Sequence, residues 1–398
     1  MSEAATAVIL PGQKRAGAWT FGILFLFESL ARAFAAGVLS IQAYDLLGSS
    51  QKVSMLGAVV SGTVLVITLF MPFLFGKMRR RWAYTIGCLL LVAGSGALAT
   101  FSLVGQITGT VLRNAGASIT NVTLQLYILD HIKKSDLTTS EPLRLALSTI
   151  AWGIGPYSGV WLYQNYGPLA PQLFAMFFAL VLLGIFWFLR LHDPELLPKG
   201  TLQPFNPIAN VARFVAQPRL RLAWVIAFTR SSFWAAFFTY GPLLMIEGGL
   251  GKSAGGAIIS ISQLLLLTTV FFGQAAKRKG VRLVITLCFV VMSLGAVVAG
   301  LVGIASPWVA AGLLLCGAAG AAGLDGIGAI PYMRAVKFHE RQRMTAVYRT
   351  FIDFSDLLPS LIYAVVLRYA GVSIVFVLMG VFASIIGVLS WRHLPKGM

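Results

Sequence analysis

Charged residues are scarce in this sequence, and acidic residues are the scarcest. Only 11% of the 398 residues are charged, with 13 Asp and Glu against 31 Lys and Arg, while 58% are hydrophobic and the mean hydropathy is +0.82. A soluble domain carries about 25% charged residues, so most of this surface must face lipid. The basic residues are spread between apolar runs, which is typical of loops beside an anionic membrane face and argues against nucleic-acid binding.

The residue types that bind metals or perform catalysis are also few. The three cysteines lie inside apolar runs without any CxxC or Cys/His spacing, so we expect no zinc site, no disulfide framework and no cofactor. All four histidines lie at loops or predicted helix ends, which argues against an intramembrane enzyme. A Gly-x-x-x-x-Gly-Lys-Ser/Thr loop is absent, so this chain does not drive transport with ATP by itself.

Long apolar runs are what the sequence contains instead. A hydrocarbon core of about 30 Å needs roughly 20 mostly apolar residues per helix. Six such runs lie near 18–44, 53–76, 83–104, 106–131, 144–165 and 170–191, and six more near 220–246, 254–276, 282–304, 307–333, 344–369 and 371–391. The sequence therefore predicts an all-α membrane protein of about twelve transmembrane helices, in two pseudo-repeated halves of six.

A polar, proline-rich stretch separates the two sets of runs, and its prolines rule out one continuous helix there. We expect an N-terminal six-helix half at 1–191, a cytoplasmic linker at 192–219 and a C-terminal six-helix half at 220–398. Within the linker, apolar residues from Phe205 to Val215 recur at helical spacing, which favours a short helix on the membrane surface. An irregular linker is the alternative.

The basic residues fix an orientation for the twelve spans. Nearly all the Lys and Arg residues of the loops fall on one side, and the opposite side receives only Lys52, Lys252 and Arg368. Cytoplasmic loops carry the excess of positive charge. We therefore expect a bacterial-type inner membrane protein with both termini in the cytoplasm.

Four short motifs occur in the loops after the second and eighth spans and within spans 4 and 5. They are Gly76-Lys-Met-Arg79-Arg80-Arg81-Trp82-Ala83, Gly273-Gln-Ala-Ala-Lys277-Arg278-Lys279-Gly280-Val281-Arg282, Arg113-Asn-Ala-Gly116 and Gly155-Pro156-Tyr-Ser-Gly159. These motifs resemble those of the major facilitator superfamily. The two loops are similar to the family's G-x-x-x-D-R-x-G-R-R/K loop, although a basic residue replaces its Asp, and the other two are similar to its R-x-x-G pattern and to the G-P-x-x-G core seen in exporters and antiporters.

The resemblance implies a monomeric transporter in which a central site opens alternately to either side between the two halves. It assigns gating or conformational roles, including close helix packing at the loop glycines, to a set of motif residues. These are Gly76, Arg81, Gly155, Pro156, Gly159, Gly273 and Arg278.

Ionisable residues inside the spans are the candidates for chemistry, because each costs at least about 2.5–3.5 kcal/mol at mid-bilayer and so faces protein or water. Glu28 and Arg32 lie four residues apart on the first span and can pair. We expect Glu28 to carry a proton; the alternative is a static ion pair. Arg349, Asp353 and Asp356 form a similar stripe on the eleventh span, where Asp356 and Asp353 are further proton-carrier candidates and Arg349 is a supporting residue.

Arg113 and Arg230 have no acidic residue in their own spans. Either they bind an anionic substrate through their planar donor forks, or they pair with a carboxylate of another span, for which Asp325 is a candidate. The expected substrate-binding residues are Arg32, Arg113, Arg230, Trp152, Trp234 and Asn121.

The sequence thus predicts a secondary transporter of an organic or inorganic anion, driven by a proton or counter-solute gradient. Its expected partners are the small-molecule substrate and membrane lipid. Two alternatives use the same architecture: a proton-coupled exporter of amphipathic compounds, and a lipid flippase.

Overall fold

The computed structural model describes residues 18–75, 78–131, 137–189, 207–337 and 340–395, and within these ranges the secondary structure is entirely helical. The N-terminal half consists of six long helices, one for each predicted span. They are α1 (Ala18–Leu47), α2 (Ser50–Phe75), α3 (Arg80–Ala99), α4 (Leu103–His131), α5 (Leu137–Tyr166) and α6 (Leu169–Phe188).

The C-terminal half also holds six spans, but several of them are built from more than one helix. The unbroken ones are α8 (Pro218–Glu247), α11 (Val281–Val302, followed by the 3₁₀ turn Gly303–Ala305) and α16 (Ser373–His393). The divided ones are α9 (Lys252–Leu264) with the 3₁₀ helix η1 (Leu265–Thr268) and α10 (Thr269–Lys279), then α12 (Pro307–Ile327) with α13 (Ile330–Ala335), and α14 (Arg341–Arg349) with α15 (Phe351–Val366).

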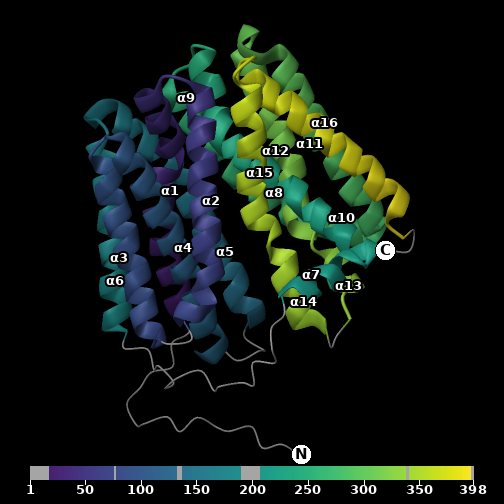
Figure 1. Cartoon of the computed structure of the whole chain (residues 1–398), viewed down its shortest axis with the longest axis horizontal. Coiled ribbons are helices and arrows are strands. Elements are labelled where there is room, and N and C mark those ends of the chain that lie inside the picture. The colour runs from purple at the N-terminus through teal and green to yellow at the C-terminus, as the bar shows by residue number, and fades with distance from the viewer. Residues whose placement is uncertain (1–17, 76–77, 132–136, 190–206, 338–339, 396–398) are drawn as a thin grey trace, which may run out of the picture.

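The predicted architecture of about twelve helices in two halves is confirmed. In Figure 1, α1–α6 form one group and most of α8–α16 the other, while α9 lies beside the first group; the halves touch through α5 with α9 and through α2 with α15. In the described part of the chain, nine spans are long and apolar enough to cross a membrane by length and composition. The other three are α4, α5 and the α14–α15 pair, in which polar residues or a break interrupt the apolar run.

The breaks in spans 8, 10 and 11 were not predicted, and their causes are local. The hydroxyls of Thr268 and Thr350 each donate a hydrogen bond to the backbone carbonyl three residues earlier. The acceptors are Leu265, at 2.6 Å, and Val347, at 2.7 Å. Such bonds compete with the helical ladder and bend it. Between α12 and α13 a glycine-rich stretch ends the helix, and Pro331 then starts the next one at a first-turn position.

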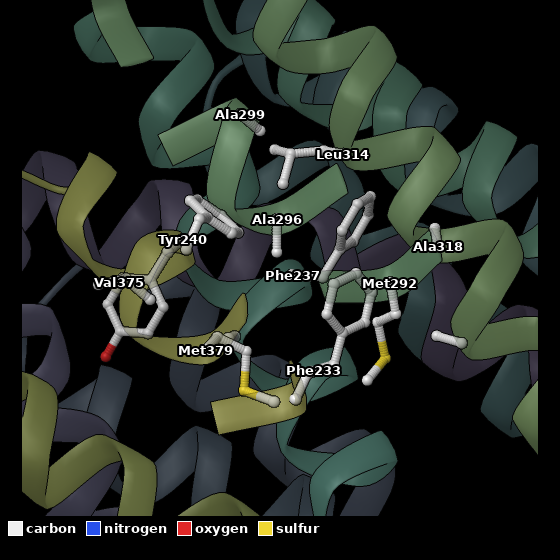
Figure 2. Close-up of a cluster of buried hydrophobic side chains, with 14 of the residues drawn as sticks. Phe233, Phe237, Tyr240, Met292, Ala296, Ala299, Leu314, Ala318, Val375 and Met379 are labelled. Carbon is white, nitrogen blue, oxygen red and sulfur yellow. The ribbon is translucent and has the colours of Figure 1, made fainter. Parts of the chain in front are cut away.

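Each half has its own apolar core. Figure 2 shows the core of the C-terminal half, where aromatic side chains of α8 pack on α11, α12 and α16. Small residues allow this packing: a Cβ atom added at Gly295 would lie 2.6 Å from the backbone nitrogen of Gly317. Backbones can approach closely only where side chains are small, which explains the glycine content of these spans.

The short helix expected in the linker is present as α7 (Pro207–Val215). Its Phe214 is buried against α8, α13 and α14, and Arg213 forms an ion pair with Glu340. Val211 and Val215 remain exposed on the outer side of the helix. Its position on a membrane surface stays a prediction.

Candidate functional site

The Gly155-Pro156-x-x-Gly159 motif brings α5 into close contact with α1. A Cβ atom added at Gly159 would lie 1.9 Å from the carbonyl oxygen of Phe34, and one added at Gly155 would lie 2.5 Å from the Cβ of Ala33. Neither position has room for a side chain. The motif therefore acts in helix packing, and it sets the distance between the ionisable residues of α1 and the side chains of α5.

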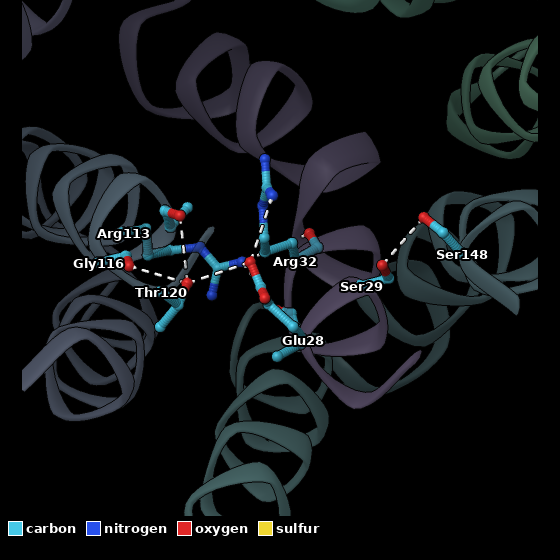
Figure 3. Close-up of polar contacts among 9 residues, drawn as sticks. Glu28, Ser29, Arg32, Arg113, Gly116, Thr120 and Ser148 are labelled. Carbon is cyan, nitrogen blue, oxygen red and sulfur yellow. Dashed lines mark hydrogen bonds and ion pairs between the residues drawn. The ribbon is translucent and has the colours of Figure 1, made fainter. Parts of the chain in front are cut away.

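Glu28 lies at the centre of a polar cluster between α1, α4 and α5. It is fully buried. Its Oε1 accepts a hydrogen bond of 3.1 Å from the Thr120 hydroxyl and lies 3.8 Å from Nη1 of Arg32, as Figure 3 shows. Its Oε2 has no hydrogen-bond partner among the described residues. The predicted pairing of Glu28 with Arg32 is thus present, but its geometry is loose.

Arg113 lies beside this pair, and both terminal nitrogens of its guanidinium group donate to neighbouring groups. Its Nη2 donates to the carbonyl oxygens of Ala31 at 2.9 Å and Arg32 at 3.4 Å, and its Nη1 donates to the Ser95 hydroxyl. The side chain is 5% exposed. In this conformation Arg113 ties α4 and α3 to α1, and its predicted role in binding substrate remains untested.

Arg230 forms an ion pair with Asp325, which the sequence suggested as its partner from another span. Its Nη1 lies 2.9 Å from Oδ1 of Asp325, on α12, and Trp234 donates its indole N–H to Oδ2 of the same carboxylate at 2.8 Å. The guanidinium carbon also lies 5.5 Å from the ring centre of Phe351. Arg230, Asp325 and Trp234 therefore form one electrically neutral group in the C-terminal half.

Three aromatic residues lie between the Glu28–Arg32 ion pair of the N-terminal half and the Arg230–Asp325 ion pair of the C-terminal half. The guanidinium carbon of Arg32 lies 5.8 Å from the ring centre of Trp152, whose ring lies 6.2 Å from that of Phe238 and at 76° to it. Phe238 in turn lies 6.0 Å from Trp234. We call Trp152, Phe238 and Trp234 the aromatic bridge.

The aromatic bridge joins four of the predicted substrate-binding residues: Arg32, Trp152, Trp234 and Arg230. Sequence reasoning missed Phe238, although it lies four residues after Trp234 and so on the same face of α8. The three rings of the bridge are half-buried, and the ionisable side chains at its two ends are also partly open: Arg32, Asp325 and Arg230 are 33%, 27% and 18% exposed.

Other predicted residues lie apart from the bridge. Asn121 is half-buried on α4, Asp353 is half-buried and Asp356 exposed on α15, and Arg349 is exposed at the end of α14. The described contacts place none of these four against the aromatic bridge or Glu28. Their predicted roles in binding or proton coupling remain untested.

The structure describes three of the four predicted loop motif residues. Gly76 lies outside the described residues, and Arg81 is half-buried on α3. Arg278 is exposed in the last turn of α10. A Cβ atom added at Gly273 would meet nothing within 4 Å. In this conformation α10 has open space at that point, and the predicted conformational role of Gly273 remains untested.

A set of polar contacts joins the two halves where α1, α5 and α8 end and α2 and α9 begin. Asp45 accepts hydrogen bonds from the Tyr163 hydroxyl at 2.6 Å and from Nζ of Lys252 at 2.5 Å, and Ser50 donates to Glu247 at 2.6 Å. We call these five residues the inter-half latch. Sequence reasoning missed it, although Lys252 was one of the three basic residues assigned to the sparse side.

The family follows from the sequence taken together with this architecture. The profile of the Major Facilitator Superfamily matches residues 21–358. The chain belongs to this superfamily. No curated protein sequence matches the chain significantly. As a member of a transporter superfamily with these helices, it is an integral membrane transport protein.

Solved structures of other superfamily transporters share the fold at low sequence identity. A POT family transporter in complex with 5-aminolevulinic acid aligns with a TM-score of 0.75 at 12% identity, over 94% of both chains. The nucleoside transporter NupG aligns at 0.73 and 15%, over 95% of this chain and 100% of its own. A bacterial homologue of the iron transporter ferroportin, in an inward-facing state, aligns at 0.75 and 14%, over 94% and 98%. Such likeness establishes the fold alone.

Proposed function

We propose that this superfamily member is a secondary transporter of a small anion, bound at Arg32 between the two halves. The observation that supports this most strongly is the loose pairing of Arg32. Its Nη1 lies 3.8 Å from Glu28 and its side chain is partly exposed, whereas Arg113 beside it is buried and donates to Ser95 and to backbone carbonyls. A buried charge without a countercharge is expensive. An anion at Arg32 can replace Glu28 as the countercharge and gains hydrogen bonds from a planar donor fork.

The coupling that we propose is a competition for Arg32. Oε1 of Glu28 lies 3.8 Å from Nη1 of Arg32, and Oε2 of Glu28 has no hydrogen-bond partner among the described residues. When an anion takes Arg32, Glu28 loses its closest cation and binds a proton instead, because the neutral form of a buried carboxyl group is then favoured. The other charged or titratable groups near Glu28 are the guanidinium groups of Arg113 and Arg144 and the side chains of Tyr84 and Cys88 on α3, and Thr120 donates a hydrogen bond to it. Asp356 and Asp353 are second candidates for the proton.

The inter-half latch supports alternating access with one end closed. It holds the halves together at the end of the bundle opposite to the start of α1. We propose that this end faces outward, since the basic loops lie at the other end, and that the termini and the linker at 192–219 are cytoplasmic in an inner membrane. The units that move are then the halves at 1–191 and 220–398 of a single chain.

Counterflow in proteoliposomes tests the function. Vesicles preloaded with one unlabelled solute are diluted into the same labelled solute, across a panel of monocarboxylates, phosphate, sulfate, neutral sugars and organic amines. We expect counterflow for anions only, and at least tenfold less of it with Arg32→Ala at equal reconstituted protein. Counterflow restricted to amines or neutral solutes would contradict the proposal.

The second candidate function is the export of amphipathic compounds. The aromatic bridge favours it, because three large rings offer apolar contact area in the middle of the protein. The Gly155-Pro156-x-x-Gly159 motif, which resembles that of exporters and antiporters, points the same way. The two functions differ in the charge of the cargo, which the same counterflow panel measures.

A further inference from the structure

The environment of Arg32 combines a charge and a flat apolar surface at one place. Its guanidinium carbon lies 5.8 Å from the ring centre of Trp152, and both side chains are half-buried. A ligand whose negative group is attached directly to a ring can place that group on the guanidinium of Arg32 and its ring on the indole of Trp152. An inorganic anion uses only the guanidinium and gains nothing from the indole.

The aromatic bridge extends this surface and leaves its rings available. Trp152 and Phe238 meet edge to face at 76°, and Phe238 and Trp234 are tilted by 46°. None of the three rings is stacked flat on another member of the bridge. Aromatic rings prefer offset or edge-to-face partners, so a ligand ring can add to this row without displacing any member.

The far end of the bridge is electrically neutral. Arg230 is paired at 2.9 Å with Asp325, whose second oxygen accepts the N–H of Trp234. A second negative charge on the ligand would meet no unpaired cation there. Arg113 offers no second anion site, because its two terminal nitrogens donate to the carbonyls of Ala31 and Arg32 and to the Ser95 hydroxyl. The arrangement therefore fits one negative charge at one end of the ligand.

We infer that the substrate is an aromatic monocarboxylate, with its carboxylate on Arg32 and its ring on Trp152 and Phe238. This inference rests on the proposed function, since it names the anion for which the transporter is built. It also explains why the site shows features of both an anion carrier and a carrier of amphipathic compounds.

Isothermal titration of the purified chain in lipid nanodiscs tests the inference with four probes. They are 2-naphthoate, cyclohexanecarboxylate, inorganic phosphate and 1-naphthylmethylammonium. We expect 2-naphthoate to bind at least fivefold more tightly than cyclohexanecarboxylate and at least tenfold more tightly than phosphate. Trp152→Leu should weaken 2-naphthoate at least tenfold, whereas Trp152→Phe, which keeps a ring, should stay within threefold of the wild type.

Trp308→Leu is the matched control, because Trp308 is 73% exposed at the start of α12 and should not affect binding. Monodisperse yield after extraction identifies any variant that fails to fold, and Phe238→Leu then provides an independent loss of a bridge ring. Phosphate binding that equals that of 2-naphthoate and ignores Trp152 would overturn the inference but leave the proposed function intact. Binding of the naphthyl cation alone would overturn both, and binding of none of the four probes would overturn the inference, with counterflow deciding the function.

Discussion

Arg32 and Arg113 illustrate how two arginines in one cluster can have different capacities. Arg113 is buried and its donors are used by the backbone of α1 and by Ser95. Arg32 is partly exposed, with a single contact of 3.8 Å to Glu28 and the ring of Trp152 nearby. A guanidinium whose donors are engaged holds helices together, while one with free donors can bind a ligand. The sequence alone placed both residues among the substrate-binding candidates and favoured Arg113, which has no acidic neighbour in its own span.

Replacing each arginine by lysine should separate these roles. Arg32→Lys keeps the charge but loses the planar fork, so we expect anion affinity to fall at least tenfold, or about 1.4 kcal/mol. Arg113→Lys should instead lower the thermal stability and the extracted yield, because lysine cannot reach both α1 carbonyls and Ser95 at once, with affinity within threefold. Titration and thermal unfolding of both variants measure this, and the opposite assignment of effects would show that Arg113 is the anion ligand.

Glu28→Gln tests the coupling role at the same scale. Glutamine keeps the shape and can still accept the hydrogen bond from Thr120, but it cannot exchange a proton. We expect accumulation driven by a pH gradient to be lost while solute exchange continues. Asp356→Asn is tested in parallel, because Asp356 is a second candidate for the proton that lies apart from the cluster; it should keep pH-driven accumulation if Glu28 is the carrier. Full pH-driven accumulation by Glu28→Gln would exclude Glu28 as the proton carrier.

At the scale of elements, the contact between α1 and α5 is what assembles the site. The carbonyl of Phe34 would lie 1.9 Å from a Cβ at Gly159, which leaves no tolerance for even one methyl group. The polar Ser29 and Ser148 hydroxyls also meet across this contact at 3.0 Å. The position of Trp152 beside Arg32 follows from this packing.

Gly159→Ala should therefore be severe, and Gly273→Ala should be mild. The first forces α1 and α5 apart and should lower the thermal midpoint and the yield strongly, since overpacking of a tight contact typically costs about 1–3 kcal/mol or more. The second adds a methyl group where nothing lies within 4 Å, and alanine is the better helix former by about 1 kcal/mol. Thermal unfolding in detergent compares them; equal melting behaviour would contradict the packing argument.

The sequence predicts a feature of the helices correctly where a single physical requirement, such as bilayer thickness or helical periodicity, decides it. Span number and order follow from bilayer thickness and charge asymmetry, and they were obtained correctly. The Glu28–Arg32 pair follows from helical periodicity. The choice of Asp325 for Arg230 and the contact of Phe238 with Trp152 depend on how distant helices pack. That information is absent from any single span.

At the scale of the whole molecule, the inter-half latch joins the two halves at the end of the bundle opposite to the start of α1. Asp45 holds both Tyr163 of its own half and Lys252 of the other, and Lys252 also lies 5.0 Å from the Tyr163 ring centre. A further chain runs from Tyr240 through Ser54 to the carbonyl of Ser360, at 2.6 and 2.8 Å. Every one of these contacts between halves must break if this end is to open.

Weakening the latch should shift the population toward a state that is open at this end. We predict that Lys252→Met lengthens the distance between spin labels at Asn165→Cys and Ser306→Cys, both exposed and on opposite halves, in a background without the native cysteines. Lys52→Met is the control, since it removes a lysine at the same end without breaking a latch contact. Double electron–electron resonance measures the distribution of distances between the two labels. Identical distributions for Lys252→Met and the parent would show that the latch does not hold this end closed.

The central claim is that an anion displaces Glu28 from Arg32 and that Glu28 then takes up a proton. Its most direct test is the proton balance of binding in weakly buffered detergent solution, followed with a pH-sensitive dye as 2-naphthoate or another anion found by counterflow is added. The account predicts uptake of about one proton per anion bound by the wild type, and binding without proton uptake by Glu28→Gln. Anion binding by the wild type with no proton uptake, or equal uptake by Glu28→Gln, would contradict it.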